Sequence, residues 1–523
     1  MLLQTPTESF GSRLTTQLRD ALELVFVHPS RVDRAICRPT VIEAIAVIMI
    51  GAAVVAVAFV MCDRFPIWVD EVMDIDPAAN ALFGHGFSST VWPFQVRGEY
   101  WAGQSPLYFA LLADWIRIVG FGVVEARSLN YALVVVAGVL LWWGCHRLAI
   151  LRTPTARLLF VVTFLAGHGV TLAVWSARYD CLAMVLAALC LLNLSATSKL
   201  VRTIGFVVLG AVLPLAGFQL VVYIGLLTAV GLLAFRRDAI PAASALGAGV
   251  TLGMAFLYLM FSTNGVWIKF LASAAGSQNS ITGQLAQVVL QGDLKGVRRL
   301  LEFPLAFLAD HSFAVILAAA AIAFWFTPRD APSRLRASAR LALLSGALIP
   351  TALFFAGKFP IYYGWMALVP TAMCLFAWTE EFGRRSPGAW RWPLGVAVVA
   401  IVVGLPTYVA NAIRLPAYER NSVADQTASR ELVADDWVYA DYASYVAARR
   451  VATVVMVPSY GNSALVPGLP EKERVTALFV SSRNLKAAID RVGGDWIMAS
   501  RAVDADADAT NSTPKVYRRR AIP

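Results

Sequence analysis

Four carboxylates follow directly on a long apolar run near the start of the chain. They are Asp70, Glu71, Asp74 and Asp76, in the stretch WVDEVMDIDPAANALFGHGF at 68–87. Carboxylates at the mouth of a membrane span are costly to desolvate and are retained where they accept a proton, bind a cation or cap a helix. Because Pro77 suits the first turn of a helix, Asp74 and Asp76 are expected to start one there. Asp70 and Glu71 come earlier, at the membrane surface, and are the candidates for catalysis.

The composition is that of a polytopic membrane protein. Of 523 residues, 58% are hydrophobic and only 15% charged, whereas soluble domains are roughly 45–50% apolar. The uncharged run at 203–235 is too long for one span, and Pro214 with Gly217 indicates a reversal, so we expect two helices there. Eleven spans are then predicted, at 44–62, 128–145, 158–177, 181–198, 203–235 (two), 239–261, 304–327, 341–357, 359–379 and 392–413.

Basic residues predict which loops face the cytoplasm. Arg and Lys gather in alternate short loops and in the N-terminal segment, as cytoplasmic segments do. This places the N-terminus inside, and the loop at 63–126 and the C-terminal tail outside. The net charge of +10 is accounted for by these loops, so it does not indicate nucleic acid as a partner.

The tail has a different character from the rest of the chain. Strand-like runs (WVYAD, VATVVMVP, TALFVSS and DWIMASR) alternate with the helical patterns ASYVAARR and SSRNLKAAIDRVG. We therefore expect a polytopic α-helical membrane protein of about eleven transmembrane helices with a C-terminal α/β extracytoplasmic domain. Its parts are a cytoplasmic leader (1–40), a transmembrane domain (41–414) that includes the first outer loop (63–126), and the α/β domain (415–523).

Several motifs in order resemble the GT-C superfamily of membrane glycosyltransferases. WVDE follows the first span, QSPLYFALLADWIRIVG comes next, and VEARSLNYAL opens the second span. The pattern is similar to the bacterial branch of protein mannosyltransferases, aminoarabinose transferases and Rgt-type lipopolysaccharide glycosyltransferases. WSARYDCLAMVLAALCL (175–191) resembles that branch's outer corner before the fourth span, and GKFPIYYGWMALVP (357–370) resembles its late Lys/Arg, Tyr and Pro motif.

This resemblance implies an inverting enzyme of the bacterial cytoplasmic (inner) membrane. Such an enzyme takes a sugar from a polyprenyl-phosphate donor at the outer leaflet and transfers it to a hydroxyl of an envelope glycan, a glycolipid or a protein. Asp70 corresponds to the family's general base. Glu71 would orient Asp70, hold the acceptor or help to bind a divalent cation, which is left open as a cofactor.

The leaving polyprenyl phosphate needs positive charge near its oxygens. Arg178 and Lys358 are predicted to supply it from the outer ends of two spans, with Arg97 as a third cation and Tyr362 or Tyr363 as a hydrogen-bond donor. The alternative for each cation is that its side chain extends to lipid headgroups without binding a ligand.

One motif departs from the family pattern. Where relatives have Lys-Pro-Pro-Leu or His-Pro-Pro-Leu, this chain has Gln104, Ser105, Pro106 and Leu107. The missing basic residue shifts phosphate binding towards the cations named above. Gln104 becomes a candidate contact for the acceptor or a sugar, together with Trp92 and Trp101. The alternative for both tryptophans is the aromatic belt found at any membrane interface.

Two other classes of function fit parts of the sequence. A transporter or flippase of lipid-linked glycans would use ionisable residues within its spans, and Glu43, Asp310 and His168 are the few candidates. A non-catalytic partner in glycan assembly would leave Asp70 dispensable.

Overall fold

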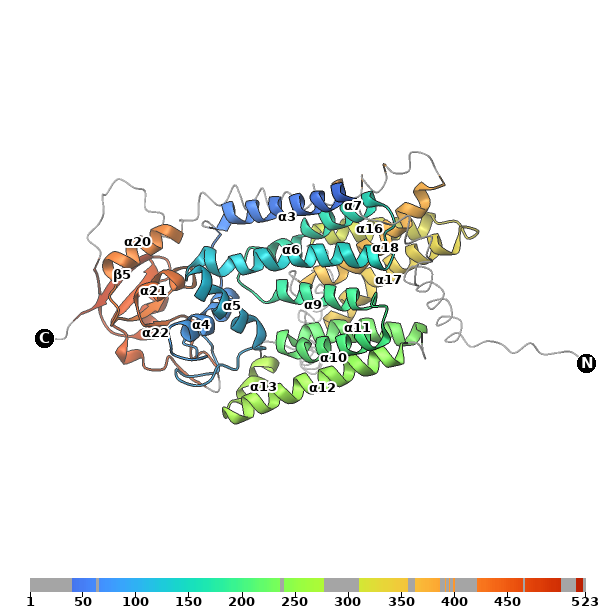
Figure 1. Cartoon of the computed structure of the whole chain (residues 1–523). Helices are drawn as coiled ribbons and strands as arrows, with labels where there is room; N and C mark the ends of the chain where they lie inside the picture. Colours follow the sequence, from blue (N-terminus) through green and yellow to red (C-terminus); the bar gives the residue numbers. More distant parts are fainter. Residues whose placement is uncertain are drawn as a thin grey trace, which may run out of the picture.

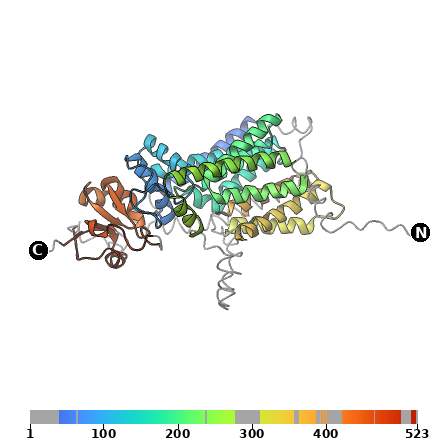
Figure 2. The same cartoon turned by 90° about the horizontal axis from the view of Figure 1, so that it is seen from below.

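The computed structural model describes residues 40–62, 65–235, 239–276, 310–355, 363–385, 421–463, 466–499 and 514–520, with four positions between 391 and 399. These residues form a bundle of long apolar helices and a smaller unit of strands and helices at one end of it (Figure 1). The helices of the first loop lie between the two parts in both views (Figures 1 and 2).

Helices occupy every predicted span before 392–413, a segment almost wholly outside the described residues. An α-helix satisfies all of its backbone hydrogen bonds internally, which lipid requires. The prediction of two helices in 203–235 is confirmed, because one helix ends at Ala216 and the next begins at Phe218. The bundle consists of α3 (Val41–Cys62), α6 (Val123–Arg147), α7 (Pro154–Leu165), α8 (His168–Val174), α9 (Asp180–Asn193), α10 (Lys199–Ala216), α11 (Phe218–Phe235), α12 (Ile240–Thr263), α16 (His311–Phe326), α17 (Ser333–Phe355) and α18 (Trp365–Gly383).

Within the described residues, four of these helices are individually long and apolar enough to cross a membrane: α3, α6, α10 and α12. The pair α7 and α8 makes a fifth candidate, bent by 59°. Helices α9 and α16 and residues 218–232 are apolar but shorter. The chain is therefore built around apolar membrane-spanning helices, and the total of eleven stays a prediction.

A buried ion pair joins the first helix of the bundle to its neighbours. Arg157 donates to both carboxylate oxygens of Glu43, at 2.6 and 2.8 Å, and the Trp142 indole donates to the same carboxylate at 2.6 Å. Removing one partner of such a pair would leave an uncompensated buried charge. Glu43 therefore joins α3 to α6 and α7.

The first loop forms two helices, α4 (Val69–Leu82) and α5 (Leu107–Val119), and α13 (Trp267–Gly276) lies near them. The prediction that a helix starts at Asp76 is wrong, because α4 begins at Val69 and contains Pro77. Asp76 is buried within α4 and accepts hydrogen bonds from the Thr90 amide, at 2.9 Å, and from the Tyr445 hydroxyl. These partners stabilise the carboxylate, and Pro77 removes only one backbone donor from the helix.

The tail contains a mixed five-stranded sheet in the order β2-β1-β3-β5-β4. Strands β2, β1 and β3 are parallel to one another, and β5 pairs in the antiparallel direction with both β3 and β4. Strand β3 is buried throughout, as an inner strand covered on both faces should be. The elements are α20 (Asn421–Glu431), β1 (Trp437–Ala440), the 3₁₀ turn Tyr442–Ser444, α21 (Tyr445–Val451), β2 (Val454–Met456), the 3₁₀ turn Lys472–Arg474, β3 (Ala477–Ser481), α22 (Leu485–Val492), β4 (Trp496–Met498) and β5 (Pro514–Arg519).

Helix α21 of the tail docks onto α4. Beyond the bond between Tyr445 and Asp76, Arg449 donates to the side-chain oxygen of Asn80 at 2.9 Å, and its guanidinium lies 4.7 Å from the ring centre of Phe83. The positions on each helix are three or four residues apart and so share one face. The tail therefore holds the second half of α4 in place.

We predict that Arg449→Gln lowers the free energy of unfolding by about 1.5–3 kcal/mol, because a buried, charge-assisted hydrogen bond is lost. The matched control is Arg450→Gln on the same helix, whose side chain is 49% exposed and pairs with Asp425 at the surface. The control should change stability by less than about 0.5 kcal/mol. Unfolding of the purified protein in detergent measures both, and equal effects would contradict the docking of α21 on α4.

Candidate functional site

Asp70 lies on the first turn of α4, beside the outer corner predicted at 175–180. One of its carboxylate oxygens is 3.2 Å from a guanidinium nitrogen of Arg178. The amide groups at the start of a helix favour negative charge at this position. The Asp70 side chain is 33% exposed, whereas that of Arg178 is only 3% exposed. Asp70 is thus the half of the pair that can meet a ligand.

Arg178 is held by more than this one carboxylate. Its Nε lies 3.3 Å from a carboxylate oxygen of Asp180, and its guanidinium is 4.7 Å from the ring centre of Trp68. A planar guanidinium suits such combined ion pairing and stacking. The arrangement fixes the Arg178 guanidinium against Asp70. The sequence predicted that both residues lie at the same face, but not that they are in contact.

Glu71, the neighbour of Asp70, is fully buried in an ion pair with Arg127 of α6. Arg127 donates to both oxygens of Glu71, at 2.6 and 2.8 Å. Its remaining N–H groups donate to the carbonyls of Cys62 and Phe65, at 2.8 and 2.9 Å, and of Pro66, at 3.4 Å. All five donors of the guanidinium are therefore used. Both carboxylate oxygens of Glu71 are occupied, which makes it a group that positions α4.

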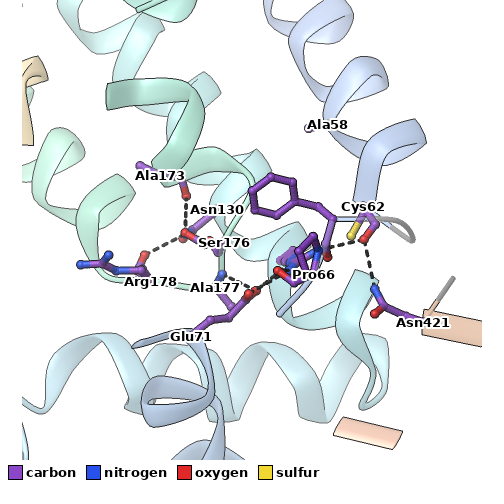
Figure 3. Close-up of polar contacts among 12 residues, drawn as sticks. Ala58, Cys62, Pro66, Glu71, Asn130, Ala173, Ser176, Ala177, Arg178 and Asn421 are labelled. Carbon is purple, nitrogen blue, oxygen red and sulfur yellow. Dashed lines mark hydrogen bonds and ion pairs between the residues drawn. The ribbon is translucent and has the colours of Figure 1, made fainter. Parts of the chain in front are cut away.

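The corner that carries Arg178 is fixed by the same network (Figure 3). The Ala177 amide donates to Glu71 at 2.9 Å. Asn130 of α6 donates its side-chain amide to the carbonyls of Ala173, Ser176 and Arg178, at 3.1, 2.5 and 2.7 Å. Glu71 is next to Asp70 in the chain, and Ala177 is next to Arg178. The buried bond between Glu71 and Ala177 therefore sets the spacing of Asp70 and Arg178.

Tyrosines from three parts of the chain surround the site. The hydroxyls of Tyr179 and Tyr363 are 2.6 Å apart. Tyr442 comes from the tail, and its pKa is raised by burial, with a further contribution from the Asp70 charge. Lys358 and Tyr362, both predicted to bind phosphate, lie outside the described residues, so their roles stay predictions.

Arg97 is not beside Arg178. Its guanidinium lies 4.8 Å from the ring centre of Trp437, the first residue of β1, and its amide donates to the Tyr460 hydroxyl at 2.8 Å. The structure therefore places Arg97 against the tail, and none of its contacts within the described part of the chain is with Arg178.

The candidate sugar contacts Trp92, Trp101 and Gln104 differ in how far they are buried. Trp92 and Trp101 are only 3% and 0% exposed, and the Trp101 ring centre lies 4.3 Å from that of Phe109 and 6.0 Å from that of Trp92. Contrary to the prediction, neither ring face is offered to a sugar, because neighbouring rings of the loop cover both. Gln104 is half-buried, next to Ser105, whose hydroxyl donates to the Pro214 carbonyl at 2.7 Å.

No family model and no curated protein matches this chain, but solved structures of glycosyltransferases do. ArnT from Cupriavidus metallidurans aligns over 90% of this chain and 97% of its own, at 14% identity and a TM-score of 0.45. A second ArnT structure that matches is bound to undecaprenyl phosphate. The Archaeoglobus fulgidus oligosaccharyltransferase with a tethered acceptor peptide covers 87% of this chain and 71% of its own (10% identity, TM-score 0.48).

The arabinofuranosyltransferase AftD from Mycobacteria is also similar. It covers 91% of this chain but only 40% of its own length, at 16% identity and a TM-score of 0.43. The activity of this chain is inferred below from its own residues.

Sequence reasoning missed the residues that position the site. Arg127 and Asn130 both lie within VEARSLNYAL, which carried the resemblance, but neither was given a role. A polar signal was present, since an arginine and an asparagine three residues apart at the start of an apolar span need partners. Tyr442 carried no such signal, because only the fold of the tail brings it to Asp70.

Asp74 lies one turn beyond Asp70 on α4 and is completely buried. Its Oδ2 has no hydrogen-bond partner among the described residues. Burial, with the nearby charges of Asp70, Asp180 and Glu71, raises the pKa of Asp74 well above its ordinary value, although Arg178 opposes the shift. Asp74 therefore holds its proton to a higher pH than an ordinary aspartate does. Within the described ranges, no group of three or more acidic, His or Cys side chains is placed to hold a metal ion.

We predict that Asp74 makes the protein less stable as the pH rises. Above about pH 4 the unfolded chain releases this proton and the folded protein keeps it, so the free energy of unfolding falls until the raised pKa is passed. Asp74→Asn removes this loss, and its stability relative to wild type should increase with pH. Thermal unfolding between about pH 4 and 8 measures the trend. Asp114→Asn, at a 70% exposed side chain, is the control, and parallel curves for wild type and Asp74→Asn would refute the assignment.

Proposed function

We propose that this chain is an inverting membrane glycosyltransferase of the GT-C superfamily, which moves a sugar from a polyprenyl-phosphate donor to an acceptor hydroxyl. The observation that carries the proposal is the pair of Asp70 and Arg178, 3.2 Å apart. A partly exposed carboxylate there meets a fixed cation at the outer end of a helical bundle. Such a pair offers a base for a hydroxyl and positive charge for a departing phosphate.

In the proposed reaction Asp70 is the general base. The acceptor hydroxyl gives its proton to Asp70 as its oxygen forms the new bond to the anomeric carbon. The bond from that carbon to the phosphate oxygen breaks, and its electron pair leaves with polyprenyl phosphate. Attack and departure on opposite faces of the sugar invert the anomeric configuration. Glu71 takes no part in these bonds and positions α4.

Arg178 has two roles in this proposal. It orients Asp70 through their ion pair, and its charge stabilises the phosphate that leaves nearby. The Tyr179 and Tyr363 hydroxyls, 2.6 Å apart, are placed to share hydrogen bonds with the same group. Lys358 and Tyr362 are proposed as further phosphate contacts, as the motif at 357–370 implies.

We further propose that the site faces outward from the bacterial cytoplasmic membrane. The first loop and the tail lie at the same end of the bundle (Figure 1), and the basic loops predict that this end is extracytoplasmic. The N-terminus is then cytoplasmic and the C-terminus extracytoplasmic. The acceptor is an envelope glycan, a glycolipid or a protein that reaches the outer leaflet.

The transporter hypothesis gains no support from the buried ionisable groups in the described spans. Glu43 is paired with Arg157, and Asp310 accepts the amides of Phe313 and Gly169 at 3.0 and 3.3 Å. These contacts give both acids structural partners. A transported substrate would have to compete with them.

The proposal predicts that Asp70→Asn reduces sugar transfer by about 10²–10⁴-fold, the usual contribution of general base catalysis. The test uses cells that lack the protein, complemented with each variant at matched membrane levels. Mass spectrometry of envelope glycans and of polyprenyl-linked sugars should show a glycan one sugar short and an accumulated donor.

Asp114→Asn is the matched control, because Asp114 is an exposed carboxylate of the same loop, paired at the surface with Arg117. It should restore the normal glycan. Full restoration by Asp70→Asn would remove Asp70 as the base and favour the flippase or the assembly partner. Accumulation of the donor without a shortened glycan would favour the flippase.

A further inference from the structure

A cleft of about 570 Å³ lies between the first loop and the tail. Asn80 of α4, His85 and Arg97 line one side of it, and Thr453, Pro470 and Glu471 of the tail line the other. The volume is within the range of sites that bind small ligands. The cleft is distinct from the site around Asp70 and Arg178, because neither of those residues lines it.

Arginine side chains lie in and beside this cleft. Arg97 is exposed, and Arg449 bonds to Asn80 in the wall of the cleft. Burial lowers the pKa of His85, and the charges of Arg449 and Arg97 lower it further. Among the described residues that line the cleft, Glu471 is the acid, and Arg474 pairs with it at 3.2 Å. Asp76, which accepts the amide of the lining residue Thr90, is a further acid behind the wall. The exposed guanidinium in the lining is that of Arg97. An anion entering the cleft would meet a field that already acts on His85.

The lining also suits a carbohydrate. Ser88 and Thr453 present hydroxyls beside Asn80, while Val96 and Pro470 provide apolar surface. Sugars combine hydroxyl groups with apolar ring faces, so a mixed wall of this kind matches both. Hydrogen bonds between the loop and the tail, such as that from the Thr90 hydroxyl to the Val455 carbonyl at 2.6 Å, hold the two walls together.

We propose that this cleft binds an anionic group, phosphate or carboxylate, on the acceptor glycan, with Arg97 as the principal contact. This inference rests on the proposed function, since it names the class of acceptor. Asn80 follows Asp70 by ten residues of α4, which corresponds to about 15 Å along a helix. The cleft would therefore recognise an acidic sugar some distance from the reacting hydroxyl and select extended acceptors.

Binding to the full-length protein in nanodiscs tests the proposal by calorimetry with two matched probe pairs. Trehalose 6-phosphate is compared with trehalose, and digalacturonate with its dimethyl ester. We expect wild type to bind at least one acidic probe about tenfold more tightly than its neutral counterpart. Arg97→Gln should abolish this preference, and Glu471→Gln should increase it, a gain that misfolding would not produce. Arg117→Gln, an exposed arginine of the same loop, should leave it unchanged.

The outcomes separate the sources of the anion and the two proposals. A preference for only the phosphorylated or only the carboxylated probe supports the cleft and identifies the group. Equal binding of acidic and neutral probes, no binding at millimolar concentrations, or a preference that persists in folded Arg97→Gln would overturn it. The same assay on Asp70→Asn should show unchanged binding. If Asp70→Asn transfers sugar normally while the cleft still binds acidic probes, the proposed function fails and anion binding stands.

Discussion

The buried ion pair between Glu71 and Arg127 is the constraint on which the end of the bundle beside the tail depends. The Arg127 guanidinium, at the start of α6, bonds to the Glu71 carboxylate at the start of α4 and to the carbonyls of Cys62, at the end of α3, and Phe65. Such a pair is favourable only when each donor and acceptor is satisfied. Since Glu71 also accepts the Ala177 amide, the geometry of the Asp70 and Arg178 pair is set by bonds that solvent and substrate do not reach.

Helix α4 serves two regions of the molecule at once. Its first turn carries Asp70, and its second half packs against α21 through Asp76 and Asn80. Because both contacts are on one short helix, a displacement of its second half would also move the first turn that carries Asp70. The cleft beside Arg97 is a further product of this contact, because its two walls come from the loop and from the tail.

The sequence was informative wherever local composition decides structure. Apolar runs located the helices, and strand-like runs located β1 to β4, but α20 and β5 were not predicted. The motifs predicted that Asp70 and Arg178 lie at the same face, but not their direct contact. The start of α4 and the position of Arg97 could not be predicted, because each depends on partners far along the chain. Asp76 illustrates this, since its neighbouring Pro77 favoured a helix start and its bond to Tyr445 overrides that local preference.

The contact between Asp76 and Tyr445 also constrains biosynthesis. The two residues are 369 positions apart, so α4 emerges from the ribosome and reaches the membrane long before its partner exists. Until the tail has been made and folded, Asp76 and Asn80 lack their bonds to Tyr445 and Arg449. A truncated or stalled chain would carry Asp70 on an unsupported helix, so the site is assembled only once nearly the whole chain has been made.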